Sequence, residues 1–194
     1  MVYLILHINI LTTLYKFKIK KKKNLFINSM RESVICNILF LGDSFVGKTS
    51  IINTFVSNIF DEYQEITIGV SLYTKHIENN KKNYNLRIWD TNGNKNYKSL
   101  FIPYYKIAEA VVIVYDLTNI ESLKNAEKLI DSVKNINKKC QIFVVGNKCD
   151  IKNITENGDK NKVNIDIKHQ IISAKNIKNI KKLFDNIINS IQIE

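Results

Sequence analysis

The segment around residue 45 sets the architecture of this chain. Residues 42–49 are Gly-Asp-Ser-Phe-Val-Gly-Lys-Thr and satisfy the pattern G-x-x-x-x-G-K-[ST] of a phosphate-binding loop. An apolar run at 34–41 precedes the loop, and residues 48–56 have the character of a helix. The pattern requires this strand–loop–helix context, which makes a coincidental glycine turn a poor alternative. The segment predicts an α/β domain that binds a ligand with phosphate groups.

Each part of the loop has a chemical reason. Glycines let the backbone curl until its N–H groups face phosphate oxygens, and the N-terminus of the next helix adds a favourable dipole. The Lys48 ammonium can reach β- and γ-phosphates, and the Thr49 hydroxyl can ligate Mg²⁺. The residues predicted to surround the phosphates are Gly42, Asp43, Ser44, Phe45, Val46, Gly47, Lys48, Thr49 and Ser50.

Apolar runs alternate with helical patterns along the rest of the chain. Strands are predicted at 34–41, 70–78, 84–90, 110–115, 141–145 and 169–172, a polar turn at 79–83, and helices at 48–56, 121–136 and 176–191. This alternation predicts a six-stranded, mostly parallel sheet flanked by helices, with right-handed crossovers. Ligands of such sheets bind beyond the carboxyl ends of the strands, so the loops that follow strands should hold the site.

The loop after the fifth predicted strand selects the base. Residues 146–150 are Gly-Asn-Lys-Cys-Asp. The Asp150 carboxylate can accept hydrogen bonds from guanine N1 and from the exocyclic amine, a donor pair that adenine lacks. Asn147 is expected to tie this loop to the phosphate-binding loop, and the Lys148 stem to cover one face of the base. The ligand predicted here is therefore GTP or GDP, with Mg²⁺.

A second base-reading segment follows the sixth predicted strand. It is Ser173-Ala174-Lys175, in which the Ala174 backbone N–H could donate to guanine O6. Two guanine-reading segments in this order, each after a strand, make a coincidence very improbable.

Composition excludes several other classes of protein. The chain has 194 residues, enough for one domain with its own core. With 45% hydrophobic residues, six glycines and one proline, it is neither a disordered polyelectrolyte nor a collagen-like chain. Three cysteines are too few for a disulfide scaffold and favour a reducing compartment.

The first 32 residues are predicted to lie outside the domain that occupies 33–194. Residues 1–29 hold six lysines and no acidic residue, so a start at Met30 would lower the net charge from +11 to +5. Three interpretations stay open: an arm on an acidic membrane surface, a targeting segment, or a disordered or wrongly predicted extension. The apolar part is too short to cross a bilayer as a helix. Because the basic character is local and lacks interleaved aromatic residues, nucleic-acid binding is not predicted.

The chain resembles small GTPases of the Ras superfamily over about residues 33–191, and the Rab family in particular. The motifs that carry the Rab resemblance are Thr67-Ile-Gly-Val70, Trp89-Asp-Thr91, Lys98-Ser-Leu100, Tyr104-Tyr105 and Val114-Tyr-Asp-Leu-Thr118. Residues 60–67 and 97–110 resemble early-endosomal members of that family. The resemblance implies a P-loop NTPase fold of the small G-domain type.

The resemblance also implies roles for matching residues. Phe60 should stack against guanine, and Asp90 should hold Mg²⁺ through water. Thr67 should ligate Mg²⁺ and contact the γ-phosphate, which the Gly93 N–H should also sense; loss of that phosphate would release both segments. The implied catalytic residues are Lys48, Thr67, Gly93 and Asn94, and the implied metal ligands are Thr49, Thr67 and Asp90.

One motif departs from the family at the catalytic position. Family members have Asp-x-x-Gly-Gln, but residues 90–94 are Asp-Thr-Asn-Gly-Asn. The glutamine orients the attacking water, and Asn94 is one methylene shorter. Asn92 replaces a usual alanine, and Lys95 replaces an acid. These changes predict slow intrinsic hydrolysis; the alternative is neutral drift, with hydrolysis restored by an activating protein.

Two other departures concern 151–167 and the C-terminus. The stretch 151–167 is polar and contains Asn157-Gly158, so the helix expected there should be missing or reduced. The sequence ends Ile191-Gln-Ile-Glu194 without the cysteines that Rab proteins prenylate, and neither candidate start provides a myristoylation glycine. We therefore expect no lipidation motif.

The resulting expectation is a monomeric, cytoplasmic GTP/GDP switch, also peripheral on endosomal or other vesicle membranes. Effectors, an exchange factor and a GTPase-activating protein would bind it through the switch regions. The alternative is a scaffold that binds GTP without hydrolysing it and acts only through protein–protein interaction.

Overall fold

The computed structural model describes residues 33–94, 100–152 and 167–191. The N-terminal arm, Lys95, most of the stretch 151–167 and the last three residues of the chain lie outside the described residues. The expectations about them, including the domain boundary at residue 32, stay predictions.

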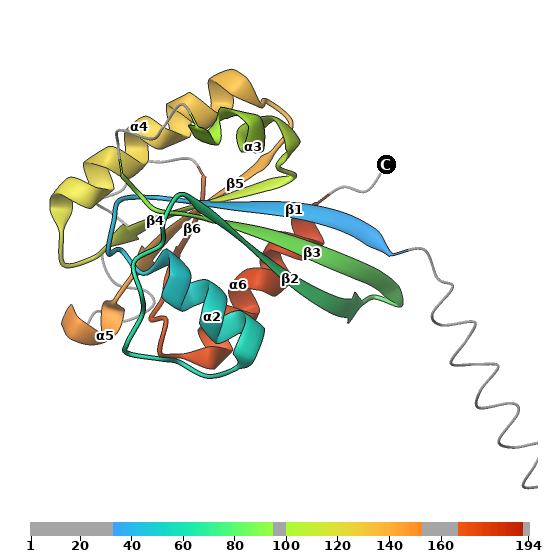
Figure 1. Ribbon diagram of the computed structural model, residues 1–194, viewed down its shortest axis with the longest axis horizontal. Helices are drawn as coiled ribbons and strands as arrows, with labels where there is room; N and C mark the ends of the chain where they lie inside the picture. Colours follow the sequence, from blue (N-terminus) through green and yellow to red (C-terminus); the bar gives the residue numbers. More distant parts are fainter. Residues whose placement is uncertain (1–32, 95–99, 153–166, 192–194) are drawn as a thin grey trace, which may run out of the picture.

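The architecture is a six-stranded sheet between two layers of helices (Figure 1). The strands are β1 (Val34–Leu41), β2 (Val70–Asn79), β3 (Lys82–Thr91), β4 (Ala110–Asp116), β5 (Gln141–Asn147) and β6 (Lys168–Ile171). Their order is β2-β3-β1-β4-β5-β6, and β2 and β3 form the one antiparallel pair among the described strands. The predicted mostly parallel sheet is confirmed.

The helices divide between the two faces of the sheet. They are α2 (Lys48–Ser57), α3 (Ile102–Ile107), α4 (Ile120–Ile136), α5 (Cys149–Lys152) and α6 (Ile177–Ser190). Helices α2 and α6 cover one face, and α3 and α4 the other (Figure 1). Sequence analysis does not anticipate α3, because a six-residue helix is too short to show helical periodicity.

The turn between β2 and β3 is shorter than predicted. Pairing continues to Asn79 and Lys82, which leaves two residues, Asn80 and Lys81, in the turn. Both have left-handed φ values, 50° and 64°. A two-residue turn of this kind matches the twist of the flanking strands, and asparagine tolerates it well. The expected turn at 79–83 is therefore wrong in length, because polar residues there continue the ladder.

The core beneath α6 is built by a stripe of apolar residues at helical spacing. The buried residues of the stripe are Ile180, Leu183, Phe184, Ile187 and Ile188. The Phe184 ring stacks on that of Phe55 from α2 and lies 5.9 Å from the ring of Phe40 on β1, centroid to centroid. Phe184 thus joins two helices to the sheet, which makes it a central packing residue.

Replacing Phe184 by alanine is expected to lower the free energy of unfolding by about 3–5 kcal/mol, because a buried aromatic ring is lost and a cavity is left. Asn186→Ala, at an exposed position of the same helix, should change it by less than about 0.5 kcal/mol. Urea unfolding of the two variants measures both values. Equal midpoints for the two would contradict the packing described here.

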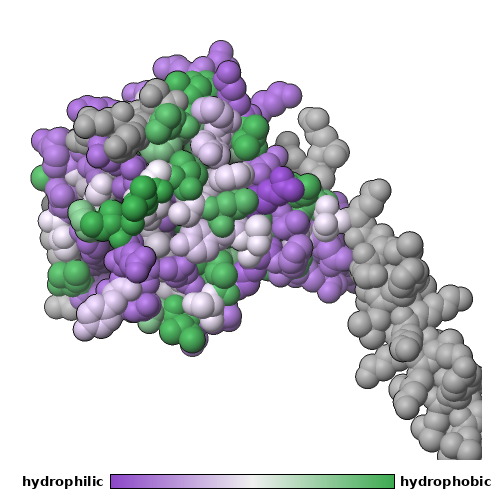
Figure 2. All heavy atoms as spheres, viewed as in Figure 1, coloured by the Kyte–Doolittle hydropathy of each residue, from purple (hydrophilic) through white to green (hydrophobic). Residues whose placement is uncertain are grey.

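The outer surface is mixed. On the face shown in Figure 2, hydrophobic side chains lie in separate groups between hydrophilic ones. No helix in the described ranges combines the length and the apolar character that crossing a membrane would demand.

Candidate functional site

A cavity of about 480 Å³ opens at the edge of the sheet where the parallel strands end. This volume is typical of small-molecule sites. The predicted site residues that line it are Ser44, Phe45, Gly47, Lys48, Thr49, Ser50, Phe60, Thr67, Asn147, Lys148, Asp150, Ser173, Ala174 and Lys175. The other predicted residues, Gly42, Asp43, Val46, Asp90, Gly93 and Asn94, do not line it. The fold thus brings segments more than one hundred residues apart in sequence to one hollow.

The phosphate-binding loop is shaped by two glycines that lie close to neighbouring strands. Gly42 has φ 138°, and a Cβ there would lie 2.1 Å from the Val114 carbonyl oxygen. Gly47, with φ 96°, precedes α2, and a Cβ there would lie 2.3 Å from Asn147 Nδ2. A Cβ at Gly42 would meet backbone, so the loop can lie this close to β4 only with glycine there; a larger residue at position 47 would have to displace the Asn147 side chain and adopt a left-handed φ.

Lys48 is held inside this loop. Its side chain is 5% exposed, and Nζ donates to the carbonyl oxygens of Gly42 at 3.0 Å and Asp43 at 2.8 Å. Burial lowers the pKa of Lys48 to about 8, although the charges of Asp90 and Asp43 act in the opposite direction. A phosphate group in the cavity would favour the charged ammonium, so Lys48 is prepared to bind an anion.

Three oxygen-bearing side chains converge beside the cavity. Thr49 Oγ1 donates to Asp90 Oδ2 at 2.5 Å, Thr67 Oγ1 donates to the same oxygen at 3.0 Å, and the two hydroxyls are 2.9 Å apart. They come from α2, the segment before β2, and the end of β3.

This arrangement fits Mg²⁺. The other Asp90 oxygen, Oδ1, is buried without a hydrogen-bond partner among the described residues, and burial raises the pKa of the carboxyl. The described residues contain no group of three or more His, Cys, Asp or Glu side chains able to hold a metal. One carboxylate with hydroxyls, completed by phosphate oxygens and water, is the arrangement that Mg²⁺ commonly uses.

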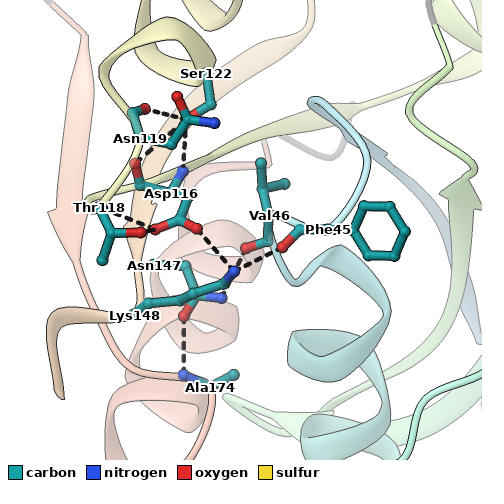
Figure 3. A network of polar contacts seen from close by, with 9 residues as sticks. All are labelled: Phe45, Val46, Asp116, Thr118, Asn119, Ser122, Asn147, Lys148 and Ala174. Carbon is teal, nitrogen blue, oxygen red and sulfur yellow. Dashed lines mark hydrogen bonds and ion pairs between the residues drawn. The ribbon is translucent and has the colours of Figure 1, made fainter. Parts of the chain in front are cut away.

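Asn147 joins the base-reading loop to its neighbours (Figure 3). Its Nδ2 donates to the Val46 carbonyl at 2.9 Å, so the predicted tie to the phosphate-binding loop is present. Its Oδ1 accepts from the Ala174 backbone N–H at 3.0 Å. In this structure that N–H is therefore directed at Asn147, and its predicted donation to guanine O6 stays a prediction.

Lys148 has a partner that sequence analysis misses. Its Nζ lies 2.7 Å from Asp116 Oδ2 and donates to the Phe45 carbonyl at 2.8 Å (Figure 3). Asp116 Oδ1 accepts from both the backbone and the hydroxyl of Thr118. Although burial acts to raise it, the pKa of Asp116 lies below its ordinary value because of these bonds and the Lys148 charge. A carboxylate at the end of the strand beside β5 is the signal that could have identified this partner.

Phe60 and Lys175 meet at the other rim of the cavity. Phe60 is partly buried against the core, and Lys175 Nζ lies 5.5 Å from its ring centroid. The same ammonium is 3.2 Å from Glu62 Oε1, an exposed ion pair that contributes little stability. Phe60 is thus positioned by packing, at the rim where a planar base could stack on it.

The segment after β3 lies against the phosphate-binding loop; Asn92 lines the large cavity, whereas the predicted catalytic residues Gly93 and Asn94 do not. A Cβ on Gly93 would be 2.5 Å from the Asp43 carbonyl carbon, and Ser44 Oγ donates to the Asn92 carbonyl at 3.0 Å. The exposed Asn94 donates its backbone N–H to Asn92 Oδ1 at 3.0 Å. Gly93 and Asn94 therefore sit beside a small second cavity of about 20 Å³.

Asn125 of α4 supports the same loop and is a second residue that sequence analysis misses. It is 8% exposed, and its Nδ2 donates to Asp43 Oδ2 at 2.6 Å. Helical periodicity places Asn125 beside the apolar face of α4, and a buried polar side chain there is the available signal.

The sheet, the phosphate-binding loop after β1 and the N-K-x-D segment after β5 together define a P-loop nucleotide-binding α/β domain. A profile of the Ras family matches residues 37–193. Ras-related protein SEC4 of Candida albicans, including strains WO-1 and SC5314, is 31% identical over 170 residues, which cover 85% of this chain and 81% of the relative. The chain therefore belongs to the Ras family of small GTPases, and within that superfamily it is Rab-like.

Membership of the Ras family establishes the general ligand, reaction and kinds of partner. Small GTPases of this family bind guanine nucleotide with Mg²⁺, hydrolyse GTP, and interact with effectors, exchange factors and activating proteins. The further resemblance to early-endosomal members stays a prediction.

Proposed function

We propose that this chain is a GTP/GDP switch that recruits effectors in intracellular vesicle trafficking and hydrolyses GTP slowly. The observation that carries the proposal is the single cavity shared by Lys48, Thr49 and Thr67 at one side and Asp150 and Phe60 at the other. A guanine nucleotide would satisfy both sides at once: its phosphates match the ammonium and the loop N–H groups, and its base matches the carboxylate and the ring.

The switch would work through two segments that meet at the γ-phosphate. Bound Mg²⁺ would neutralise phosphate charge, with Thr49, Thr67 and Asp90 holding it. Thr67 and the Gly93 N–H are the groups proposed to sense the γ-phosphate. Their segments are joined, since the Asn92 N–H donates to the Gly69 carbonyl at 3.1 Å. Loss of the phosphate would therefore release both segments together.

The slow hydrolysis is attributed to Asn94. Its amide has the chemistry to orient a water molecule, but the side chain is one methylene shorter than glutamine and its backbone is bonded to Asn92. Since catalysis of this kind depends mostly on positioning, a misplacement of about 1 Å can cost about 10²-fold.

Asn94→Gln is expected to raise the single-turnover rate of GTP hydrolysis by about 10- to 100-fold, because it restores the reach of the amide. Phosphate release from the preloaded protein measures the rate. Asn135→Gln, the same exchange at an exposed position of α4, is the matched control and should leave the rate unchanged. An unchanged rate for Asn94→Gln would argue against an otherwise intact catalytic site.

That negative result would favour the second candidate, a Rab-like scaffold that binds GTP without hydrolysing it. The observation behind this candidate is that Asn94 does not line the large cavity. The direct test is to load the protein with GTP and Mg²⁺ and follow the nucleotide over time. Conversion to GDP supports the switch, and intact GTP after many hours supports the scaffold.

Partners would bind a monomer through the segment before β2 and the segment after β3. Ile66 and Ile68 are 70% and 91% exposed, and they flank Thr67, so a partner that packs on them could detect whether Thr67 is engaged. We place the protein in the cytoplasm and peripherally on endosomal or other vesicle membranes, in line with its Rab-like character. Imaging of the tagged full-length chain tests this location.

A further inference from the structure

Asn125 of α4 binds a carboxylate of the phosphate-binding loop outside the large cavity. Asp43 and Asn125 both line the small cavity of about 20 Å³, and neither lines the large one. Asn125 Nδ2 donates to Asp43 Oδ2 at 2.6 Å, a short bond of the kind that a charged acceptor makes. Because Asn125 is 8% exposed, its amide needs such a partner inside the protein. The bond therefore holds the Asp43 carboxylate against α4.

The direction of this carboxylate matters because a negative charge in a phosphate-binding loop opposes the binding of an anion. Lys48 Nζ donates to the Asp43 carbonyl at 2.8 Å, and the charge of Asp43 acts on the Lys48 ammonium. A carboxylate that was free to turn could pair with this ammonium, since opposite charges attract strongly in a partly buried site. Such a pair would compete with phosphate groups for Lys48, and the carboxylate would also repel them.

The backbone of the same loop residue supports the segment after β3. A Cβ on Gly93 would lie 2.5 Å from both the Asp43 carbonyl carbon and the Ser44 nitrogen, so Gly93 packs on the peptide between these residues. Ser44 Oγ also donates to the Asn92 carbonyl at 3.0 Å. Asn125 thus has two routes to the site through Asp43: the charge of the carboxylate and the position of this peptide.

We infer that Asn125 is a positioning residue of the nucleotide site, which holds the Asp43 carboxylate on α4 and so keeps its charge away from Lys48 and from the phosphates. The inference rests on the proposed function, since it takes a guanine nucleotide with Mg²⁺ as the ligand of the large cavity. An asparagine suits this role because a neutral amide binds a carboxylate without adding a charge that would compete with Lys48 for the phosphates.

A double-mutant cycle on the full-length chain tests the inference, with the dissociation constant for GDP in the presence of Mg²⁺ as the readout. Asn125→Ala is expected to weaken GDP binding about tenfold, because the released carboxylate competes for Lys48. In an Asp43→Asn background, where residue 43 carries no charge, the same Asn125→Ala change should weaken binding less than about twofold. Asn135→Ala, at an exposed position of the same helix, is the matched control and should leave the affinity unchanged.

Exchanging the two side chains tests the pair without changing their volumes. Asn125→Asp alone places two carboxylates at a contact of 2.6 Å, so it should weaken GDP binding at least as much as Asn125→Ala. Adding Asp43→Asn restores a bond between an amide and a carboxylate, now with the charge on α4, and should recover most of the lost affinity. Thermal melts establish that each variant is folded at the temperature of the titration.

Two outcomes would overturn the inference. An Asn125→Ala variant with the wild-type affinity for GDP would mean that the Asp43 carboxylate needs no restraint. Equal losses from Asn125→Ala in the two backgrounds would mean that Asn125 supports the position of the loop and does not control its charge. Failure of the wild-type chain to bind GDP is a different result, since it would reject the proposed function and, with it, the ligand on which this inference depends.

Discussion

Asp150→Asn is expected to lower the affinity for GDP by about 10²- to 10⁴-fold. The carboxylate is proposed to accept two hydrogen bonds from guanine, each worth about 1.5–3 kcal/mol because the acceptor is charged. An amide presents a donor to one of the two guanine donors and so leaves that group unpaired. Xanthine carries a carbonyl where guanine carries its amine, so the same variant should gain affinity for xanthosine diphosphate.

Equilibrium titration of wild type and variant with GDP and with xanthosine diphosphate measures the two affinities. Asp131→Asn, at an exposed position of α4, removes the same charge far from the base-reading loop and should alter neither affinity. If Asp150→Asn lost affinity for both diphosphates equally, Asp150 would support the loop but would not read the base.

Lys48→Met is expected to lower the affinity for GDP by about 10³-fold or more. The variant keeps the length and the apolar stem of the side chain but removes the ammonium that is proposed to bind the phosphates, and hydrogen bonds from a charged donor to phosphate are among the strongest in proteins. The fold should survive, because methionine suits a side chain that is 5% exposed. Calorimetric titration with GDP, together with a thermal melt, separates binding from stability.

The control for this prediction is Lys124→Met. Lys124 forms an exposed ion pair with Glu121 on α4 at 3.5 Å, so its loss should affect neither binding nor the melting temperature measurably. A nearly unchanged GDP affinity in Lys48→Met would mean that the phosphates do not lie at this loop.

Much of this fold could be predicted because the central strands β1, β4 and β5 are largely apolar runs, and β2 and β3 flank a polar turn. The run that became β1 begins and ends at the predicted residues, and the strand is buried along most of its length. The binding loops were equally accessible, since a phosphate-binding loop needs glycines at fixed spacing and a guanine-reading loop needs a carboxylate after a strand. Such requirements are local, so they leave a pattern in the sequence.

The parts that escaped prediction depend on contacts across the fold. Asp116 ends β4 and Lys148 directly follows the neighbouring strand β5, and nothing in either motif alone indicates that they form an ion pair. The bond from Asn125 to Asp43 joins residues 82 positions apart. The left-handed φ of 64° at Phe45 is likewise invisible in a pattern whose central positions accept any residue.

At each free end, the β2–β3 hairpin carries one of the two segments proposed to sense the γ-phosphate. Val70 pairs with Thr91, and the Asn92 N–H bonds to the Gly69 carbonyl just beyond that pair. The segments of Thr67 and Gly93 are thus joined through the hairpin, so a ligand or partner that orders one segment favours order in the other. By thermodynamic reciprocity, any protein that grips Ile66 and Ile68 more tightly in the GTP state must tighten the hold on GTP by the same factor. The occupancy of the nucleotide site in a cell would then report the supply of partners as much as the supply of GTP.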